Sequence, residues 1–79
     1  MARVLLFGPL RDLAGWRERR VAASSVEALR AALASQDPAL GEALNAAGVK
    51  VAVDQAIVAG DAPLADDAEV AFLPPMSGG

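Results

Sequence analysis

The chain has 79 residues, a length that allows one small domain with a modest hydrophobic core. It contains no cysteine and no histidine, which excludes disulfides, a catalytic thiol, thiolate metal sites and imidazole chemistry. The formal net charge of −3 argues against nucleic acid and anionic membranes as partners and favours a basic protein. Because a chain without cysteine suits a reducing compartment, a cytoplasmic location is expected.

The first quarter of the chain predicts two paired strands. Residues 2–8 form an apolar run that Gly8-Pro9 ends, which is typical of a buried strand. Residues 10–15 predict a connection with Gly15 as its turn residue. Residues 16–22 predict a second, largely exposed strand that forms a hairpin with the first.

A main helix and a shorter helix are predicted next. Ser24 and Glu27 have the spacing of a capping box, in which each side chain accepts from the other residue's N–H, and the helix should end by Gln36. Asp37-Pro38 predicts the N-cap and first residue of the second helix, with Gly48 as its C-cap. An apolar stripe at helical spacing should face the sheet: Val26, Leu29 and Leu33.

The last third predicts three strands. Residues 49–54 alternate in polarity, Ile57-Val58 is a very short strand after a turn, and residues 69–73 form the closing strand. The complete order predicts an α+β fold of the β-grasp, ubiquitin-like type, with a mixed sheet of about five strands packed on one main helix plus a short second helix. The globular domain is expected over residues 1–73, with the closing strand well inside the sheet.

Residues 74–79 have the sequence Pro-Pro-Met-Ser-Gly-Gly and predict an extended arm. The prolines cannot extend a sheet and make the root of the arm stiff, whereas two glycines are slim enough to enter a narrow channel. We expect the arm to deliver the terminal carboxylate of Gly79 into the active site of another protein. The alternative is that these residues are an ordinary frayed terminus.

The carboxylate of Gly79 is the predicted reactive group, although a carboxylate is by itself a poor electrophile. Adenylation by ATP would provide a leaving group, and a sulfur nucleophile could then displace AMP and leave a thiocarboxylate. A protein without cysteine could carry sulfur on its own backbone in this way.

Two other groups of residues have both a structural and a functional interpretation. Phe72 and Leu73 should point to opposite faces, so that one is core and the other can lie exposed beside the arm as part of a docking surface. Arg11 and Asp12 predict either a surface ion pair or a partner contact. An acidic cluster is interpreted as solvated turns or a partner-facing patch rather than a metal site, and no metal is expected: Asp61, Asp66, Asp67 and Glu69.

Three segments together resemble the family of small, sulfur-carrier subunits of molybdopterin synthase. They are residues 4–15, residues 25–30 and, most specifically, residues 63–79 with their Pro-Pro-Met-Ser-Gly-Gly ending. The sequence differs from many members at Asp54, where they have asparagine, and at Leu73, where they have an aromatic residue. These differences concern partner contacts and leave the arm unchanged.

The resemblance implies the role of each part. An activating enzyme adenylates Gly79 with ATP and a sulfur-transfer system converts it to a thiocarboxylate, while this chain binds no cofactor. The arm then enters the large synthase subunit, which holds the catalytic residues, and donates sulfur to cyclic pyranopterin monophosphate within a heterotetramer. The chain itself is a sulfur donor rather than a catalyst. The partner-binding positions carried over are Phe7, Arg11, Leu73, Pro74, Pro75, Met76, Ser77 and Gly78.

Two alternatives share the same terminal chemistry. A ubiquitin-like modifier would be joined through Gly79 to lysines of target proteins. The presence of a single lysine, Lys50, makes this chain a better donor than acceptor in such a reaction. The sulfur carrier of the thiazole pathway also ends in Gly-Gly, but the two prolines argue against it.

Overall fold

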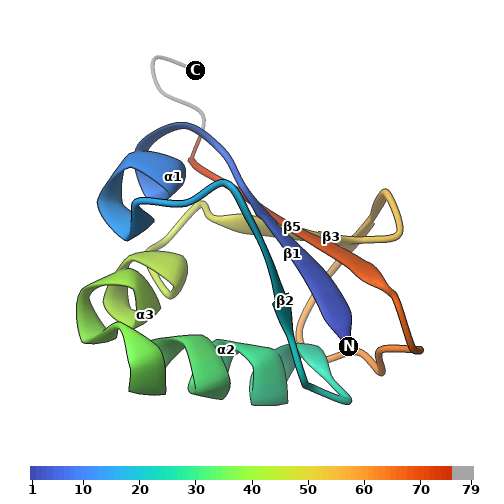
Figure 1. The fold of residues 1–79 in the computed structure, drawn as a ribbon. Helices are drawn as coiled ribbons and strands as arrows, with labels where there is room; N and C mark the ends of the chain where they lie inside the picture. The colour runs from blue at the N-terminus through green and yellow to red at the C-terminus, as the bar shows by residue number, and fades with distance from the viewer. Residues whose placement is uncertain (76–79) are drawn as a thin grey trace.

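The computed structural model describes residues 1–75; Met76, Ser77, Gly78 and Gly79, which complete the predicted arm, lie outside the described residues. Residues 1–75 contain three helices and five strands (Figure 1). The helices are α1 (Gly8–Ala14), α2 (Val26–Gln36) and α3 (Pro38–Leu44), and the strands are β1 (Ala2–Leu6), β2 (Glu18–Val21), β3 (Lys50–Val53), β4 (Ala56–Val58) and β5 (Glu69–Leu73). Within this part of the chain, none of the helices has the length and apolar character needed to cross a membrane.

The strands form one mixed sheet in the order β2-β1-β5-β3-β4. β5 runs parallel to β1 and antiparallel to β3, so the last strand lies at the centre of the sheet. The antiparallel pair β1 and β2 and the antiparallel pair β3 and β4 complete the two sides. Figure 1 shows α2 crossing one side of this sheet. The predicted β-grasp fold is therefore confirmed.

The core lies between α2, α3 and the inner face of the sheet. The predicted apolar stripe of α2 is buried, and β5 contributes Val70 and Phe72, both fully buried. Complete burial of a side chain of this size contributes about 1.5–3 kcal/mol. The largest fully buried side chains are Phe72, Leu6, Leu29, Leu33, Leu40, Leu44, Val4, Val26 and Val70.

The connection predicted over residues 10–15 was wrong for residues 10–14, which belong to helix α1, whereas Gly15 is a turn residue as predicted. The first strand also ends at Leu6 instead of residue 8. Pro9 occupies the first turn of the helix, where its fixed φ suits a helix and its missing N–H is not needed. Gly15 ends the helix with φ +82° and donates its N–H to the carbonyl of Arg11. Seven residues do not form a stable helix alone, so packing of the buried Leu10 stabilises α1.

The predicted capping box at the start of α2 was also wrong. The N-cap is Ser25, whose Oγ accepts a hydrogen bond from the N–H of Ala28 at 3.1 Å. The N–H of Glu27 instead donates to Oδ1 of Asp61 at 2.9 Å, so a residue 34 positions away caps this helix. The backbone carbonyl of Ser24 accepts from the N–H of Leu64 at 2.9 Å, which ties the same loop to the helix start.

Asp37 caps α3 as predicted, accepting from the N–H of Leu40 at 3.2 Å, but the C-cap is Asn45 and not Gly48. The predicted turn at Asp54-Gln55 is confirmed: both residues have positive φ, which suits a two-residue connection between β3 and β4. The second strand is shorter than predicted, since it spans Glu18–Val21 rather than residues 16–22.

Candidate partner interface at the root of the arm

The strand that leads to the predicted arm is held from both sides. Phe72 pairs with Leu6 of β1 and with Val51 of β3, and its side chain is completely buried. Replacement of such a phenylalanine by alanine typically costs about 3–5 kcal/mol. The position and direction of the chain at Leu73 are therefore set by the core of the domain.

The two prolines leave the sheet between two glycines. A Cβ atom added to Gly8, at the start of α1, would lie 3.4 Å from Cγ of Pro74. A Cβ atom added to Gly48, in the loop between α3 and β3, would lie 3.0 Å from Cβ of Pro75. Both glycines have positive φ, +54° and +89°, so the backbone itself also favours glycine there. The root of the arm is thus flanked by α1 and by residues 45–49.

An apolar groove lies beside this root. It has a volume of about 770 Å³. A second hollow, which shares Ala43 and Ala46 with the first, extends it along α1 and α3 to the half-exposed Leu13. Neighbouring hollows with mostly apolar linings on a small domain indicate a binding surface for another molecule. The groove is lined by Pro9, Leu10, Ala43, Ala46, Val49, Leu73, Pro74 and Pro75.

The outer face of the sheet is also apolar near its centre. Strand register places Leu5, Ala71, Ala52 and Ile57 in one row across four strands, and residues paired in this way share a face. Ile57 lies on the edge strand β4 with 59% of its surface exposed. Sequence analysis did not single out Ile57, because a short strand does not reveal which of its residues lacks a covering element.

The predicted interface residues within the described part of the chain gather at one end of the sheet. Because β1 and β5 are parallel and Leu6 pairs with Phe72, Phe7, which directly follows β1, and Leu73, the last residue of β5, lie at the same end of the sheet. Phe7 is 43% exposed and Leu73 is partly exposed, which confirms that Leu73, unlike Phe72, lies outside the core. The structure therefore places Phe7 and Leu73 beside the prolines that begin the arm.

Arg11 lies on the exposed side of α1, the helix that flanks the arm root. Its Nε is 3.7 Å from Oδ1 of Asp12, so the predicted ion pair is present. Because both side chains are largely exposed, the pair contributes only about 0–1 kcal/mol. The guanidinium of Arg11 is consequently available to a partner at little energetic cost.

Asp61 and Asp67 of the acidic cluster lie in connections, where they have structural roles, and Glu69 is the first residue of β5. Asp61 caps α2 from a distance, as described above. Asp67 has a positive φ of 63° and lies 3.8 Å from the guanidinium of Arg20. The N–H of Glu69 donates to Oδ1 of Asp54 at 3.0 Å, which fastens the start of β5 to the end of β3.

The fold and the surfaces around Pro74 and Pro75 define a ubiquitin-like β-grasp domain whose central strand leads directly into a proline-rooted segment. The chain belongs to the ThiS family, whose sequence profile matches residues 4–79. It is 43% identical over 81 residues to the molybdopterin synthase sulfur carrier subunit of Escherichia coli K12, an alignment that covers 100% of both proteins. The resemblance inferred from the sequence is thereby confirmed.

Solved structures show the same fold. SAMP1 from Haloferax volcanii, a small archaeal modifier protein, is 28% identical with a TM-score of 0.84, and 99% of this chain and 98% of that chain are covered. A complex of subunits 1 and 2 of molybdopterin-converting factor from Helicobacter pylori contains a chain that is 24% identical with a TM-score of 0.72, covering 99% of this chain and 97% of that one. At 24% identity, the likeness to the Helicobacter chain shows a shared fold.

Proposed function

We propose that this chain is the sulfur carrier subunit of a molybdopterin synthase in the cytoplasm. The observation that carries the proposal is the 43% identity to the Escherichia coli subunit, which extends over the whole of both chains. It is supported by the position of β5, whose central place in the sheet gives the arm a rigid base. The absence of cysteine from the sequence is compatible with a carrier that holds sulfur on its backbone carboxylate.

The chemistry proceeds on the carboxylate of Gly79. An oxygen of this group attacks the α-phosphate of ATP in the activating enzyme, pyrophosphate leaves, and a mixed anhydride with AMP remains. A sulfur nucleophile supplied by a sulfur-transfer system then attacks the carbonyl carbon and AMP leaves with the bonding electrons. Where the sulfur nucleophile is a persulfide of the donor, a thiol cleaves the S–S bond of the resulting acyl disulfide and forms a disulfide with the donor's sulfur, so that the carbon that carried two oxygens carries one oxygen and one sulfur. This thiocarboxylate is the sulfur donor of the synthase.

The proposed partner is the large subunit of the synthase, in a heterotetramer that contains two copies of each chain. The arm enters the active site of the large subunit and transfers sulfur to cyclic pyranopterin monophosphate. The exposed apolar surface around Phe7, Leu73 and the groove beside Pro75 supplies the docking area, since such surfaces favour protein association. Arg11 at the rim of this surface would pair with an acidic group of the large subunit.

A second candidate function is conjugation of the chain through Gly79 to lysines of target proteins. It is favoured by the likeness to SAMP1, a small archaeal modifier protein, at a TM-score of 0.84. Both functions require the same adenylate and differ only in the nucleophile that attacks it. The sulfur carrier role is preferred because the identity to the Escherichia coli protein is higher, at 43% against 28%.

Intact mass spectrometry after co-expression with the activating enzymes distinguishes the two functions. The carrier role predicts a mass increase equal to the replacement of one oxygen by sulfur, and its loss when Gly79 is deleted. The modifier role predicts larger conjugates instead. The variant Lys50→Arg removes the single lysine, so lysine-linked conjugates that persist in it must contain other proteins. Conjugates without any thiocarboxylate would overturn the carrier assignment.

A further inference from the structure

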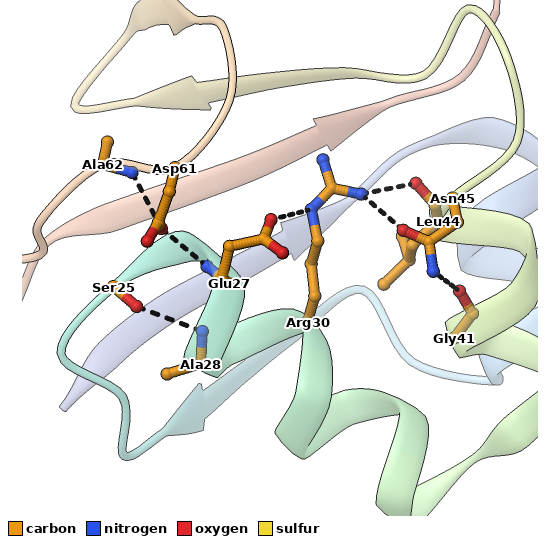
Figure 2. Close-up of polar contacts among 9 residues, drawn as sticks. All are labelled: Ser25, Glu27, Ala28, Arg30, Gly41, Leu44, Asn45, Asp61 and Ala62. Carbon is orange, nitrogen blue, oxygen red and sulfur yellow. Dashed lines mark hydrogen bonds and ion pairs between the residues drawn. The ribbon is translucent and has the colours of Figure 1, made fainter.

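Arg30 lies on α2 but contacts residues at the end of α3 and the ring of Phe72 on β5. Its side chain projects from α2 towards the end of α3 and is only 22% exposed (Figure 2). Nη1 donates to the carbonyl oxygen of Leu44 at 2.9 Å and to Oδ1 of Asn45 at 3.1 Å. Hydrogen bonds from a charged donor are about twice as strong as those between neutral groups, so these two contacts hold the acceptors firmly.

The two acceptors are the last residue of α3 and its C-cap. The carbonyl groups at a helix end lack partners within the helix, and Arg30 satisfies one of them from outside. Asn45 in turn donates from Nδ2 to the carbonyl of Gly41 at 3.2 Å, as Figure 2 also shows. Arg30 therefore fixes the point at which the chain leaves α3 and enters the loop formed by residues 45–49.

Arg30 also lies against the strand that leads to the arm. The carbon at the centre of its guanidinium is 5.7 Å from the centre of the Phe72 ring, within the range of a cation–π contact. Phe72 directly precedes Leu73, the last residue of β5. Nε of Arg30 is 3.7 Å from Oε1 of Glu27, one turn earlier on α2, which is an ion-pair distance and not a hydrogen bond.

The loop fixed by Arg30 forms a wall beside the arm root. Ala46 and Val49 line the apolar groove together with Pro74 and Pro75. Gly48, in the same loop, approaches Pro75 so closely that an added Cβ would lie 3.0 Å from its Cβ. Displacement of this loop would therefore change the space into which Pro75 fits.

We propose that Arg30 is a positioning residue for sulfur delivery: it sets the direction of the arm by holding the 45–49 loop against Pro75. The proposal rests on the sulfur carrier function proposed above. Because a pre-set arm loses less freedom when it enters the partner, loss of this support raises the carrier concentration needed for transfer. Once the arm is bound to the large subunit, its reactive end occupies the same place in a variant of Arg30 as in the unmodified chain. The limiting rate of sulfur transfer should therefore be unchanged.

The test measures sulfur transfer from the thiocarboxylated carrier to the pterin precursor with the purified large subunit, over a range of carrier concentrations. Arg30→Met keeps the length of the side chain but removes the charge and both hydrogen bonds. We expect the carrier concentration that gives half-maximal transfer to rise about tenfold, with little change in the limiting rate. A tenfold rise corresponds to a fall to about a tenth in the fraction of carrier molecules whose arm is positioned for binding. Arg30→Lys, which keeps a charged donor, should restore part of the difference.

A matched control separates positioning from general stability. Val21→Ala removes core volume on β2, at the far edge of the sheet, and lowers the melting temperature without touching the loop. At a temperature where both variants are folded, Val21→Ala should transfer sulfur with the half-saturating concentration of the unmodified chain. Asn45→Ala removes one acceptor of Arg30 at an exposed position and should show a smaller shift in the same direction as Arg30→Met.

The experiment distinguishes failure of the positioning role of Arg30 from failure of the proposed sulfur carrier function. If the unmodified carrier transfers no sulfur, the function itself is refuted. If it does transfer sulfur but Arg30→Met and Asn45→Ala keep its half-saturating concentration, or if Val21→Ala raises it equally, the positioning role is refuted. Hydrogen exchange at the Val49 amide, which donates to the carbonyl of Ala46 at 3.3 Å, gives a readout independent of activity. This exchange should accelerate in Arg30→Met and remain unchanged in Val21→Ala.

Discussion

Two glycines of this chain provide a matched pair of substitutions that isolates the contact between the domain and the arm root. Gly15 and Gly48 have similar left-handed backbone angles, with φ of +82° and +89°. A Cβ added to Gly15 meets no described atom within 4 Å, whereas one added to Gly48 would lie 3.0 Å from Cβ of Pro75. Alanine at either position introduces the same backbone strain, but only at Gly48 does it push against the arm.

The expected loss of stability is similar for the two variants. A residue with a Cβ in the left-handed region loses roughly 1–2 kcal/mol relative to glycine. For a domain of this size, 1 kcal/mol lowers the melting temperature by about 4–8 °C. The additional contact in Gly48→Ala adds little, because Pro75 is exposed and can move by the few tenths of an ångström that are required. Thermal or urea unfolding of both variants measures this loss in the free energy of unfolding.

Binding to the large subunit should separate the two variants. Gly15→Ala should bind with unchanged affinity, whereas Gly48→Ala should bind several-fold more weakly because Pro75 is displaced from its position against the loop. Isothermal titration calorimetry at a temperature where both are folded would measure the difference. Equal affinities would show that the approach of Gly48 to Pro75 has no part in presenting the arm, and would contradict the reasoning.

Three further results are expected. Gly41→Ala should destabilise the domain by about 1–3 kcal/mol in urea unfolding, because the new Cβ would lie 2.6 Å from Cα of Ala34 and force α2 and α3 apart; a stabilised variant would contradict this packing. Asp61→Ala should cost about 0.5–2 kcal/mol by the same assay, since the N–H of Glu27 loses its cap; unchanged stability would show that water replaces the carboxylate without loss. Deletion of Gly79 should leave the circular dichroism spectrum and melting temperature unchanged while abolishing thiocarboxylate formation, and a truncated chain that still accepts sulfur would exclude the proposed chemistry.

Local patterns predicted the elements whose signals do not depend on distant residues. The apolar stripe at Val26, Leu29 and Leu33 identified α2, and Asp37-Pro38 identified the start of α3, because helix periodicity and capping act over a few residues. The strand over residues 69–73 was predicted with the boundaries that the structure shows. The order of these elements was sufficient to predict the β-grasp fold.

The errors occurred where distant contacts decide the outcome. Helix α1 is too short to be stable by itself and forms because Leu10 is buried in the core, which no local pattern reveals. The capping box failed because Asp61, 34 residues away, takes the N–H of Glu27. Gly48 was interpreted as a helix cap, whereas its conformation allows close approach to Pro75.

The sequence alone therefore determined the class of fold and, through the ending Pro-Pro-Met-Ser-Gly-Gly, the kind of chemistry proposed, since both depend on residues adjacent in the chain. Tertiary structure decided how the base of the arm is held. It placed β5 between β1 and β3, and it brought Gly48 and the partners of Arg30 together from separate segments. Such contacts arise only when the buried faces of α2, α3 and the sheet come together to exclude water from the core.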